Sequence, residues 1–430
     1  MTTSPSALAH QRSIYLAGVA GDRPPVPLDG EALEREAEKR MSSEAFAYIA
    51  GGAGAGLTVA ANRADFDRWR IVPRMLNDVS EVNLSTKLFG MDLPAPLFLA
   101  PLGVMELTHP ESDLAVARAA SKHGVPLIFS NQASRPMEEV ARAMGDAPRW
   151  FQLYWSKNEE LVKSFVARAE NCGCGAIVVT LDTKMLGWRV KDLDLAYLPF
   201  LRGKGIAQYT SDPVFARLVA EMPDDPDAPK PKINLNSLST LWQMINAHPG
   251  KSLDNLKSGR ARKAVKLFTE IYTNPTLNWS HIARLRGYTK LPIILKGVVH
   301  PEEAARAVDE GVDGLIISNH GGRQVDGAVS TIAALPTIAE AVKGRIPLIL
   351  DSGIRTGADM IKALALGASA VAIGRPYAYG LALAGEEGVS EVIRGLLSDF
   401  ELNLRLSGGT KPADIERKWL VPAPSGPRLP

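Results

Sequence analysis

Short runs of apolar residues alternate with segments of helical periodicity along most of this chain. The helical segments carry apolar residues three and four positions apart, as one buried helix face requires, for example over residues 114–122, 161–169, 301–309 and 358–366. Eight apolar runs of strand length lie at residues 96–100, 126–130, 150–154, 176–181, 292–296, 314–318, 347–350 and 370–373. Eight such units predict an α/β fold, a closed (β/α)8 TIM barrel with its active site at the carboxyl ends of the strands. A doubly wound sheet is the structural alternative.

Both ends of the chain depart from this alternation. Residues 1–30 include a proline-rich stretch at residues 24–27 and predict a stiff extended arm, and residues 421–430 predict a similar tail. Residues 31–50 predict one or two helices, which form an amino-terminal helical extension of the barrel. The glycine cluster at residues 51–56 follows a helical pattern and does not match a dinucleotide-binding motif, so it predicts a helix stop. We therefore predict a single catalytic domain over residues 31–420.

The largest departure is a long insertion after the fourth strand. Residues 187–291 occupy a crossover that ordinarily needs a dozen or two residues. Residues 238–247 and 261–272 predict amphipathic helices, and the proline-rich, charged residues 222–232 predict a mobile segment. Because this segment starts from the catalytic face, it is interpreted as an active-site lid, with subunit packing as the alternative.

Charge and cysteine content exclude several functional classes. The 49 basic and 47 acidic residues give a net charge of +2. The sequence therefore lacks the excess of basic residues that binding to nucleic acid or to an anionic membrane would require. No apolar stretch is long enough to span a bilayer, and the first twelve residues lack a signal layout, so we expect a cytoplasmic protein. Cys172 and Cys174 match neither a redox pair nor a zinc motif, and the scattered histidines predict no metal site.

The segment Ser318-Asn319-His320-Gly321-Gly322-Arg323 follows directly after the sixth apolar run. It places a group that titrates near neutrality three residues from a permanent cation, where a buried strand opens into a loop. Imidazole can accept a proton, and guanidinium can grip a carboxylate through two parallel hydrogen bonds. The segment therefore predicts proton removal from a substrate that carries a carboxylate, with an ordinary turn as the alternative.

The ends of the seventh and eighth strands carry a second group of candidates. Asp351-Ser352-Gly353-Ile354-Arg355 ends strand seven, and Gly374-Arg375 ends strand eight. Barrels frequently build a phosphate site at these two ends from backbone N–H groups and a short helix. Small residues allow the backbone to approach an anion, and Arg355 and Arg375 balance its charge.

In combination, the motifs resemble a known family. Gln152-Leu153-Tyr154, Leu295-Lys296-Gly297, the His320 segment and the Asp351 segment occur in the order found in FMN-dependent 2-hydroxy acid oxidases and dehydrogenases. The long fourth-strand insertion and the motif Asp-Ser-Gly-Ile-Arg-Thr-Gly are similar to the lactate 2-monooxygenase branch. The resemblance implies bound FMN, small-molecule partners in the form of an L-2-hydroxy acid and dioxygen, and a homotetramer or homo-octamer.

The resemblance also implies the cofactor contacts. Asp351 would hold the ribityl hydroxyls, and Lys296 would stabilise the negative charge of the reduced flavin. The phosphate would be held by Gly353, Arg355, Gly374 and Arg375. Further cofactor contacts are implied for Ala100, Pro101, Leu102, Ser130, Gln152, Thr180, Ser318 and Ser352.

For the substrate, the resemblance implies His320 as the base and Asp182 as the partner of the imidazolium that forms. Arg189, Arg323 and Tyr48 would bind the carboxylate, and Tyr154 would bond the substrate's own oxygen. Whether the α-hydrogen leaves as a hydride or by a carbanion is left open.

Two positions depart from the family pattern. Gln132 lies where many members carry tryptophan, which makes the pocket wall less apolar. Gly103 lies where many carry alanine, which favours space beside flavin N5 and a monooxygenase outcome. An oxidase that releases peroxide and a dehydrogenase with another acceptor remain alternatives. So do a flavin-free barrel aldolase that uses Lys296 as a Schiff-base amine, and a barrel kept only as a binding scaffold.

Overall fold

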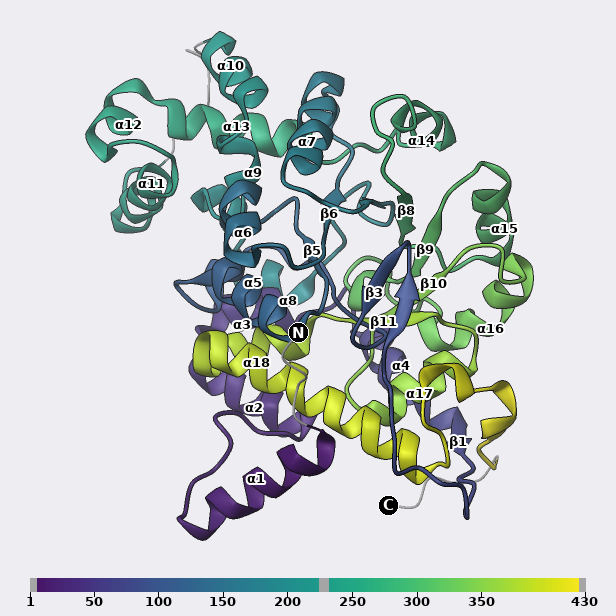
Figure 1. Ribbon diagram of the computed structural model, residues 1–430. Helices are drawn as coiled ribbons and strands as arrows, with labels where there is room; N and C mark the ends of the chain where they lie inside the picture. The colour runs from purple at the N-terminus through teal and green to yellow at the C-terminus, as the bar shows by residue number, and fades with distance from the viewer. Residues whose placement is uncertain (1–5, 224–231, 425–430) are drawn as a thin grey trace.

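The computed structural model describes residues 6–223 and 232–424. Its centre is a closed barrel of eight parallel strands, in which each strand pairs with the next along the chain and β11 returns to β4 (Figure 1). This confirms the predicted (β/α)8 barrel and all eight apolar runs, and the closure excludes a doubly wound sheet. The barrel strands are β4 (Leu97–Leu99), β5 (Leu127–Phe129), β6 (Arg149–Leu153), β7 (Ile177–Thr180), β8 (Ile293–Lys296), β9 (Gly314–Ile317), β10 (Leu348–Asp351) and β11 (Ala370–Ile373).

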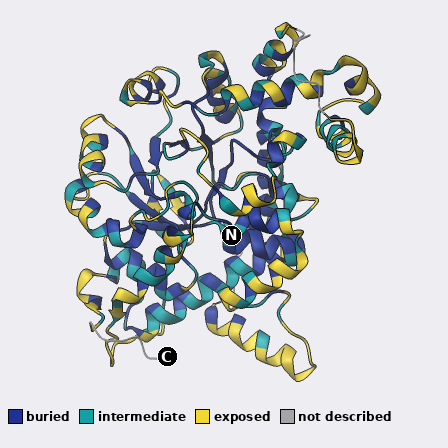
Figure 2. Cartoon of the chain, turned by 180° about the vertical axis from the view of Figure 1, so that it is seen from behind, coloured by how far each residue is buried: buried dark blue, intermediate teal, exposed yellow. Residues whose placement is uncertain are grey.

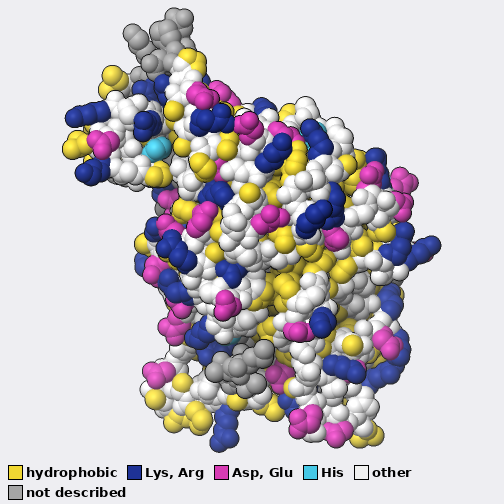
Figure 3. Space-filling view, turned by 45° about the horizontal axis from the view of Figure 1, so that its top comes forward, with side chains coloured by type: hydrophobic (Ala, Val, Ile, Leu, Met, Phe, Trp, Pro, Cys, Tyr) yellow, Lys and Arg dark blue, Asp and Glu magenta, His cyan; other side chains and the backbone are white. Residues whose placement is uncertain are grey.

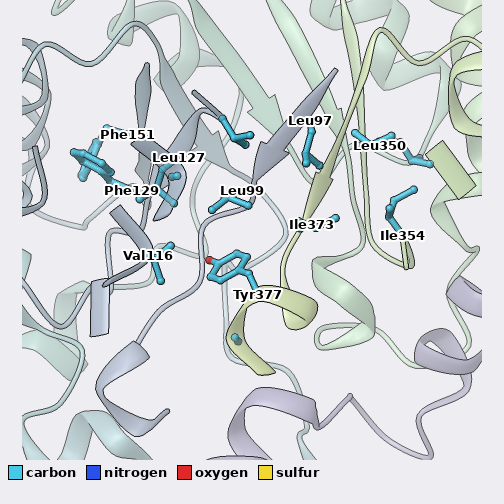
Figure 4. Packing of buried hydrophobic residues seen from close by; sticks show 14 of the residues in the cluster. Leu97, Leu99, Val116, Leu127, Phe129, Phe151, Leu350, Ile354, Ile373 and Tyr377 are labelled. Atoms are coloured by element: carbon cyan, nitrogen blue, oxygen red, sulfur yellow. The ribbon is translucent and has the colours of Figure 1, made fainter. Parts of the chain in front are cut away.

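Strand residues alternate between two apolar layers, because successive side chains of a strand point to opposite faces. One set, which includes Phe98, Ile128 and Trp150, fills the barrel interior. The other set packs outward against the helices. Figure 4 shows part of this outer layer, where Leu97, Leu99, Leu127, Phe129 and Ile373 lie near Val116 and Tyr377 of the surrounding helices.

An antiparallel hairpin closes the amino-terminal end of the barrel. It consists of β2 (Thr86–Leu88) and β3 (Met91–Leu93), and its Leu88 and Leu93 are buried in the interior layer. Phe89 at its turn packs edge-on against Trp150, with ring centroids 5.2 Å apart. The interior is thus a packed core, and the carboxyl ends of the strands are left to form the functional face.

Helices surround the barrel, and many begin at a capping side chain. Asn158, Ser330 and Thr356 each accept a hydrogen bond from a backbone N–H of the first turn that follows. Helix α18 (Arg375–Leu406) is two helices joined by a kink at Ala384 and Gly385. The helices that follow the barrel strands are α5 (Ser112–His123), α6 (Met137–Met144), α7 (Glu159–Asn171), α14 (Trp279–Leu285), α15 (Pro301–Asp309), α16 (Thr331–Val342), α17 (Gly357–Ala365) and α18 (Arg375–Leu406).

Most of the predicted insertion, residues 187–291, lies between β7 and α14, and part of it forms a lobe beside the barrel (Figure 1). Its two predicted amphipathic helices are confirmed as α11 (Leu235–Ala247) and α13 (Arg260–Ile271). The aromatic rings of Phe200, Tyr209, Phe268 and Tyr272 pack together, with the last two stacked 4.6 Å apart. Much of the predicted mobile segment, residues 224–231, lies outside the described residues. The helices are α8 (Val190–Asp194), α9 (Ala207–Thr210), α10 (Pro213–Glu221), α11 (Leu235–Ala247), α12 (Ser252–Ser258) and α13 (Arg260–Ile271).

The amino-terminal region corrects one prediction. Instead of an extended arm, residues 7–19 form helix α1 (Ala7–Val19), because Ser6 caps its first turn and the proline-rich stretch begins only after it. The Ala7 N–H donates to Glu401 Oε2 at 2.9 Å, and His10 Nε2 lies 3.2 Å from Glu391 Oε1, so α18 anchors the helix. The rest of α1 is largely exposed (Figure 2). The predicted helices over residues 31–50 are confirmed as α2 (Gly30–Arg40) and α3 (Ser43–Ala50), with α4 (Leu57–Ala64) after the glycine cluster.

The carboxyl-terminal tail also begins with regular structure. Strand β12 (Leu420–Pro422) pairs antiparallel with β1 (Trp69–Ile71), so residues 421 and 422 belong to a small sheet, and residues 425–430 lie outside the described part. Within the described residues no helix is long and apolar enough to cross a membrane. Basic and acidic side chains are interspersed on the face shown in Figure 3. Short 3-10 helices occupy Asp65–Arg68, Met105–Leu107, Pro199–Arg202, His320–Gly322, Pro412–Asp414 and Arg417–Trp419.

Candidate active site

A cavity of about 980 Å³, including its open mouth, lies at the carboxyl ends of the barrel strands. It brings together 17 of the 20 residues that the sequence predicted. The other three, Thr180, Asp182 and Ser318, lie behind the wall and hydrogen-bond to residues that line it. The predicted lining residues are Tyr48, Ala100, Pro101, Leu102, Ser130, Gln152, Tyr154, Arg189, Lys296, His320, Arg323, Asp351, Ser352, Gly353, Arg355, Gly374 and Arg375.

His320 follows β9 and adopts a positive φ of 58°, a conformation that is uncommon for a residue with a side chain. Its Nδ1 lies 2.8 Å from Asp182 Oδ1 at the end of β7. Burial lowers the pKa of His320 below its ordinary value, although Asp182 opposes this. Burial raises the pKa of Asp182, but His320 and then Lys296 outweigh burial and bring it below its usual range. An ionised Asp182 accepts the Nδ1 proton, so the neutral imidazole carries its lone pair on Nε2.

Lys296, Ser318 and Asp351 form a buried triangle at the ends of β8, β9 and β10. The Lys296 ammonium donates to Ser318 Oγ at 2.8 Å and lies 2.9 Å from Asp351 Oδ2, while the Ser318 hydroxyl donates to the same carboxylate oxygen at 2.7 Å. Burial favours the neutral amine, but Asp351 and Asp182 outweigh it and raise the pKa of Lys296. Because a Schiff base requires a neutral amine, this charged lysine argues against the aldolase alternative.

Gln152 is held between two neighbouring strand ends. Its side-chain NH₂ donates to Thr180 Oγ1 at 2.9 Å, and its side-chain oxygen accepts from the Ser130 hydroxyl at 3.2 Å. All three residues are buried. The network fixes the orientation of the carboxamide at the cavity wall, as a residue that contacts a planar polar ligand requires.

Arg189 and Arg323 bring two cations to the mouth of the cavity. Arg323 Nη1 donates to the Gly51 carbonyl at 2.8 Å, and its guanidinium lies 5.1 Å from the centroid of the Tyr48 ring. Burial, together with the neighbouring Arg189, lowers the pKa of Arg323 to about 9. Arg189 is buried and Arg323 is half-buried, and their like charges repel each other, so this place favours an anion such as a carboxylate.

Arg355 and Arg375 form a separate cationic region. Arg375 donates to the carbonyls of Ile49, Gly321 and Gly51 at 2.9–3.2 Å. Burial and the charge of Arg375 lower the pKa of Arg355 to about 10. Helix α18 begins here, and no side chain caps its first turn. The arginines and the helix start together suit a phosphate group.

Sequence reasoning missed Gln324, which joins the His320 loop to the start of the insertion. Its side-chain NH₂ donates to the carbonyls of Asp182 and Met185, at 2.8 and 2.9 Å. Its side-chain oxygen accepts from Arg189 Nη2 at 3.2 Å. Gln324 directly follows the predicted Arg323, so extending the motif by one residue would have found it. Leu186, directly before the insertion, and Tyr272 within it also line the cavity, and no sequence signal marked them as site residues.

Replacing Gln324 with leucine should weaken substrate binding, because Arg189 loses a hydrogen-bonding partner. We expect the dissociation constant of the substrate to rise roughly ten- to a hundredfold, the usual scale for a hydrogen bond to a charged group. Titrating the reduction rate against substrate concentration measures this constant. Gln243→Leu, on helix α11, is the matched control. Unchanged substrate binding in Gln324→Leu would show that Arg189 is positioned by other contacts.

The two departures from the family pattern touch each other. A Cβ placed on Gly103 would lie 3.0 Å from Gln132 Cβ and 3.1 Å from the Gln132 carbonyl oxygen. The prediction that Gly103 opens free space is therefore corrected, because Gln132 occupies the direction in which a methyl would point. Gly103 and Gln132 both line the cavity and are in contact, so a change at one of them affects the space available to the other.

Comparison with known proteins identifies a family match, two similar proteins and a similar crystal structure. The family model described as FMN-dependent dehydrogenase matches residues 37–422. An L-lactate oxidase from Lysinibacillus sphaericus is 43% identical over 397 residues, covering 92% of this chain and 93% of that protein. An FMN-dependent alpha-hydroxy acid dehydrogenase from Penicillium citrinum is 39% identical, covering 95% and 94%. A crystal structure of mandelate oxidase with (S)-4-hydroxymandelic acid superposes with a TM-score of 0.75 at 33% identity, covering 92% and 98%.

Proposed function

The chain belongs to the family of FMN-dependent 2-hydroxy acid oxidases and dehydrogenases, and from this premise we propose that it oxidises a small L-2-hydroxy acid and passes the electrons to dioxygen. We propose a lactate 2-monooxygenase-type outcome, in which lactate gives acetate, carbon dioxide and water. The main support for the proposed oxidation is the position of the neutral His320. It is held by an ionised Asp182 and lines the same cavity as Arg189 and Arg323.

The donor set of the cavity fits FMN. Arg355, Arg375 and the uncapped start of α18 suit the phosphate, and Asp351 suits the ribityl hydroxyls. Gln152 suits the polar edge of the flavin ring, and the Lys296 ammonium suits the charge that the ring gains. Bound FMN supplies the two-electron acceptor for the reaction.

The protein's own residues supply binding, orientation and proton transfer. Arg189 and Arg323 hold the substrate carboxylate, and the Tyr154 hydroxyl bonds the substrate's 2-oxygen. His320 Nε2 accepts the proton that the substrate releases, and the imidazolium formed is balanced by Asp182 at Nδ1. Two electrons leave C2, so the hydroxy acid becomes a 2-keto acid.

The monooxygenase outcome rests on how long the keto acid stays in the cavity. Hydrogen peroxide formed beside pyruvate converts it to acetate, carbon dioxide and water, whereas pyruvate that leaves first appears together with free peroxide. Tyr272 from the insertion lines the cavity, and the carbonyl of the preceding Ile271 accepts hydrogen bonds from Lys157 N and Ser156 Oγ at 3.0 Å each. This anchored insertion supports retention of the keto acid.

Anaerobic mixing with L-2-hydroxy acids, followed by product analysis in air, tests the proposal. We expect loss of flavin absorbance with L-lactate, and acetate with little free peroxide once oxygen is admitted. Stoichiometric peroxide would identify an oxidase, as the name of the Lysinibacillus relative indicates for that protein. Reduction without oxygen consumption would identify a dehydrogenase. A protein that binds no FMN would contradict the whole proposal.

Gly103→Ala should shift the partition between the two oxygen-dependent outcomes. The added methyl meets Gln132 at 3.0 Å, so the wall must move by a few tenths of an ångström beside the bound keto acid. We expect more free keto acid and peroxide and less decarboxylated product per oxygen consumed, while flavin reduction continues. Product ratios at equal oxygen consumption measure the shift. An unchanged ratio would remove Gly103 from the control of this partition.

The pH dependence of flavin reduction should report His320. Only the neutral imidazole accepts a proton, and burial lowers its pKa, so the rate should stay level at neutral pH and fall only as pH drops through a value below 6.5. Asp182→Asn removes the carboxylate that opposes burial. In this variant the inflection should move to still lower pH, and the plateau rate should fall because the imidazolium loses its balancing charge. An inflection at higher pH in the variant would contradict this assignment.

We also propose a homotetramer or homo-octamer in solution. Helix α1 exposes Leu8, Tyr15, Leu16 and Val19, and the lobe of the insertion exposes Trp242 among other apolar side chains. Exposed apolar groups of this kind support contact between subunits. Light scattering of the purified protein measures the assembly mass directly, and a monomer would contradict the proposal.

A further inference from the structure

Gln132 contributes a side-chain amide to the wall of the active-site cavity. The residue is only 8% exposed and lines the cavity wall at the loop that follows β5. Its backbone N–H donates to Ser130 Oγ at 3.1 Å, and its carbonyl accepts from Val104 N at 2.9 Å. Within the described residues, its side-chain carboxamide makes no hydrogen bond. Because Gln132 lines the cavity, its carboxamide can bond a group on a bound ligand there.

Two close neighbours pack against the backbone of Gln132. A Cβ on Gly103 would approach Gln132 Cβ to 3.0 Å, and a Cβ on Gly205 of the insertion would approach the Gln132 carbonyl oxygen to 3.1 Å. The two glycines therefore allow two chain segments to pack closely against this residue. These segments and the two backbone hydrogen bonds hold the Gln132 backbone, so its side chain starts from a fixed place at the cavity wall.

The rest of the substrate already has partners in the proposed function, on which this inference rests. Arg189 and Arg323 take the carboxylate, and His320 and Tyr154 take the 2-oxygen. The part that remains is the substituent on C3. A carboxamide is uncharged and both donates and accepts, which matches a hydroxyl group. A second carboxylate would need a cation, and each described cation that lines the cavity already serves the first carboxylate or the cofactor.

We propose that Gln132 is a specificity-determining residue that favours L-2-hydroxy acids carrying a hydroxyl on C3, that is, 2,3-dihydroxy acids. L-Lactate and L-glycerate have the same arrangement at C2 and differ only in this hydroxyl. Lactate leaves the carboxamide without a ligand partner, whereas the C3 hydroxyl of glycerate satisfies it. Both acids are oxidised at C2, and glycerate gives hydroxypyruvate.

The test compares the two acids on the FMN-bound protein. In anaerobic mixing, the second-order rate constant for flavin reduction by L-glycerate should exceed that for L-lactate by roughly tenfold, because a site built for a hydroxyl discriminates against the analogue that lacks it. In Gln132→Met, which keeps the length and removes the amide, the preference should disappear through loss of glycerate reactivity. Gln243→Met on helix α11 should keep the wild-type ratio.

A binding measurement without turnover provides an independent readout. Pyruvate and hydroxypyruvate should perturb the flavin absorbance of the oxidised protein, with hydroxypyruvate binding more tightly to wild type and equally to Gln132→Met. Wild-type protein that reacts with lactate as fast as with glycerate, or binds both keto acids equally, would overturn the inference even if the variant failed to fold. Flavin that neither acid reduces would instead overturn the proposed function itself.

Discussion

Replacing His320 with glutamine should slow anaerobic flavin reduction by roughly two to four orders of magnitude, the usual scale of general-base catalysis. In the wild type, the imidazole is partly buried, neutral and oriented by Asp182 at 2.8 Å. A glutamine amide has no comparable basicity, so the proton that leaves the substrate lacks an acceptor. FMN should stay bound, because the proposed cofactor contacts come from other residues. Stopped-flow loss of flavin absorbance measures the rate.

A matched histidine variant separates this effect from a general loss of stability. His248 is half-buried at the carboxyl-terminal cap of α11 and does not line the cavity, so His248→Gln should reduce at the wild-type rate. The FMN content and melting temperature of both variants should match those of the wild type. Near-normal reduction by His320→Gln would remove this residue from the mechanism and leave the cavity without an identified base.

Lys296→Met should damage both stability and chemistry, because it removes the cation from a buried network. Asp351 and Ser318 would lose a partner at 2.9 and 2.8 Å, and an unpaired buried carboxylate costs about 3–5 kcal/mol. The positive charge proposed to face the flavin ring would also disappear. We expect the reduction rate to fall roughly 10²–10³-fold, the scale of losing one preorganised electrostatic contact.

A double variant distinguishes these two consequences. Combining Lys296→Met with Asp351→Asn removes the unpaired charge, so the free energy of unfolding should recover toward the wild-type value. The reduction rate should stay low, because no cation returns to the site. Denaturant unfolding and stopped-flow reduction measure the two quantities separately. Recovery of the rate together with the stability would show that Lys296 acts only through folding.

The barrel was predictable from the sequence because each strand is buried on both faces. A strand between barrel interior and helices must be apolar throughout, so runs such as residues 370–373 are visible without an alignment. The helix at residues 7–19 was missed because it buries little more than Ala7 and His10. A helix with so few buried residues leaves almost no periodic signal.

The candidate site was predictable where residue type determines the chemistry, as for His320, Lys296 and Arg323. The site was not predictable where a residue's role depends only on where the fold places it. Gln324 is an ordinary polar residue until the fold brings it beside Asp182 and Arg189. The contact between Gly103 and Gln132 depends on two loops that are adjacent in the barrel but far apart in sequence, at positions 103 and 132. Directions of pKa shifts likewise depend on burial, which only the fold determines.

We expect the hairpin β2–β3 to affect the kinetics of the proposed reaction as well as the fold. It closes the amino-terminal end over a packed interior, so the cavity lies at the carboxyl ends of the strands. In the proposed reaction, dioxygen would therefore enter and the products would leave on the same side of the barrel. A keto acid that still occupies this side of the cavity would delay the departure of peroxide formed behind it. The order in which the two products leave, rather than a further catalytic group, would then decide whether the peroxide reacts with the keto acid.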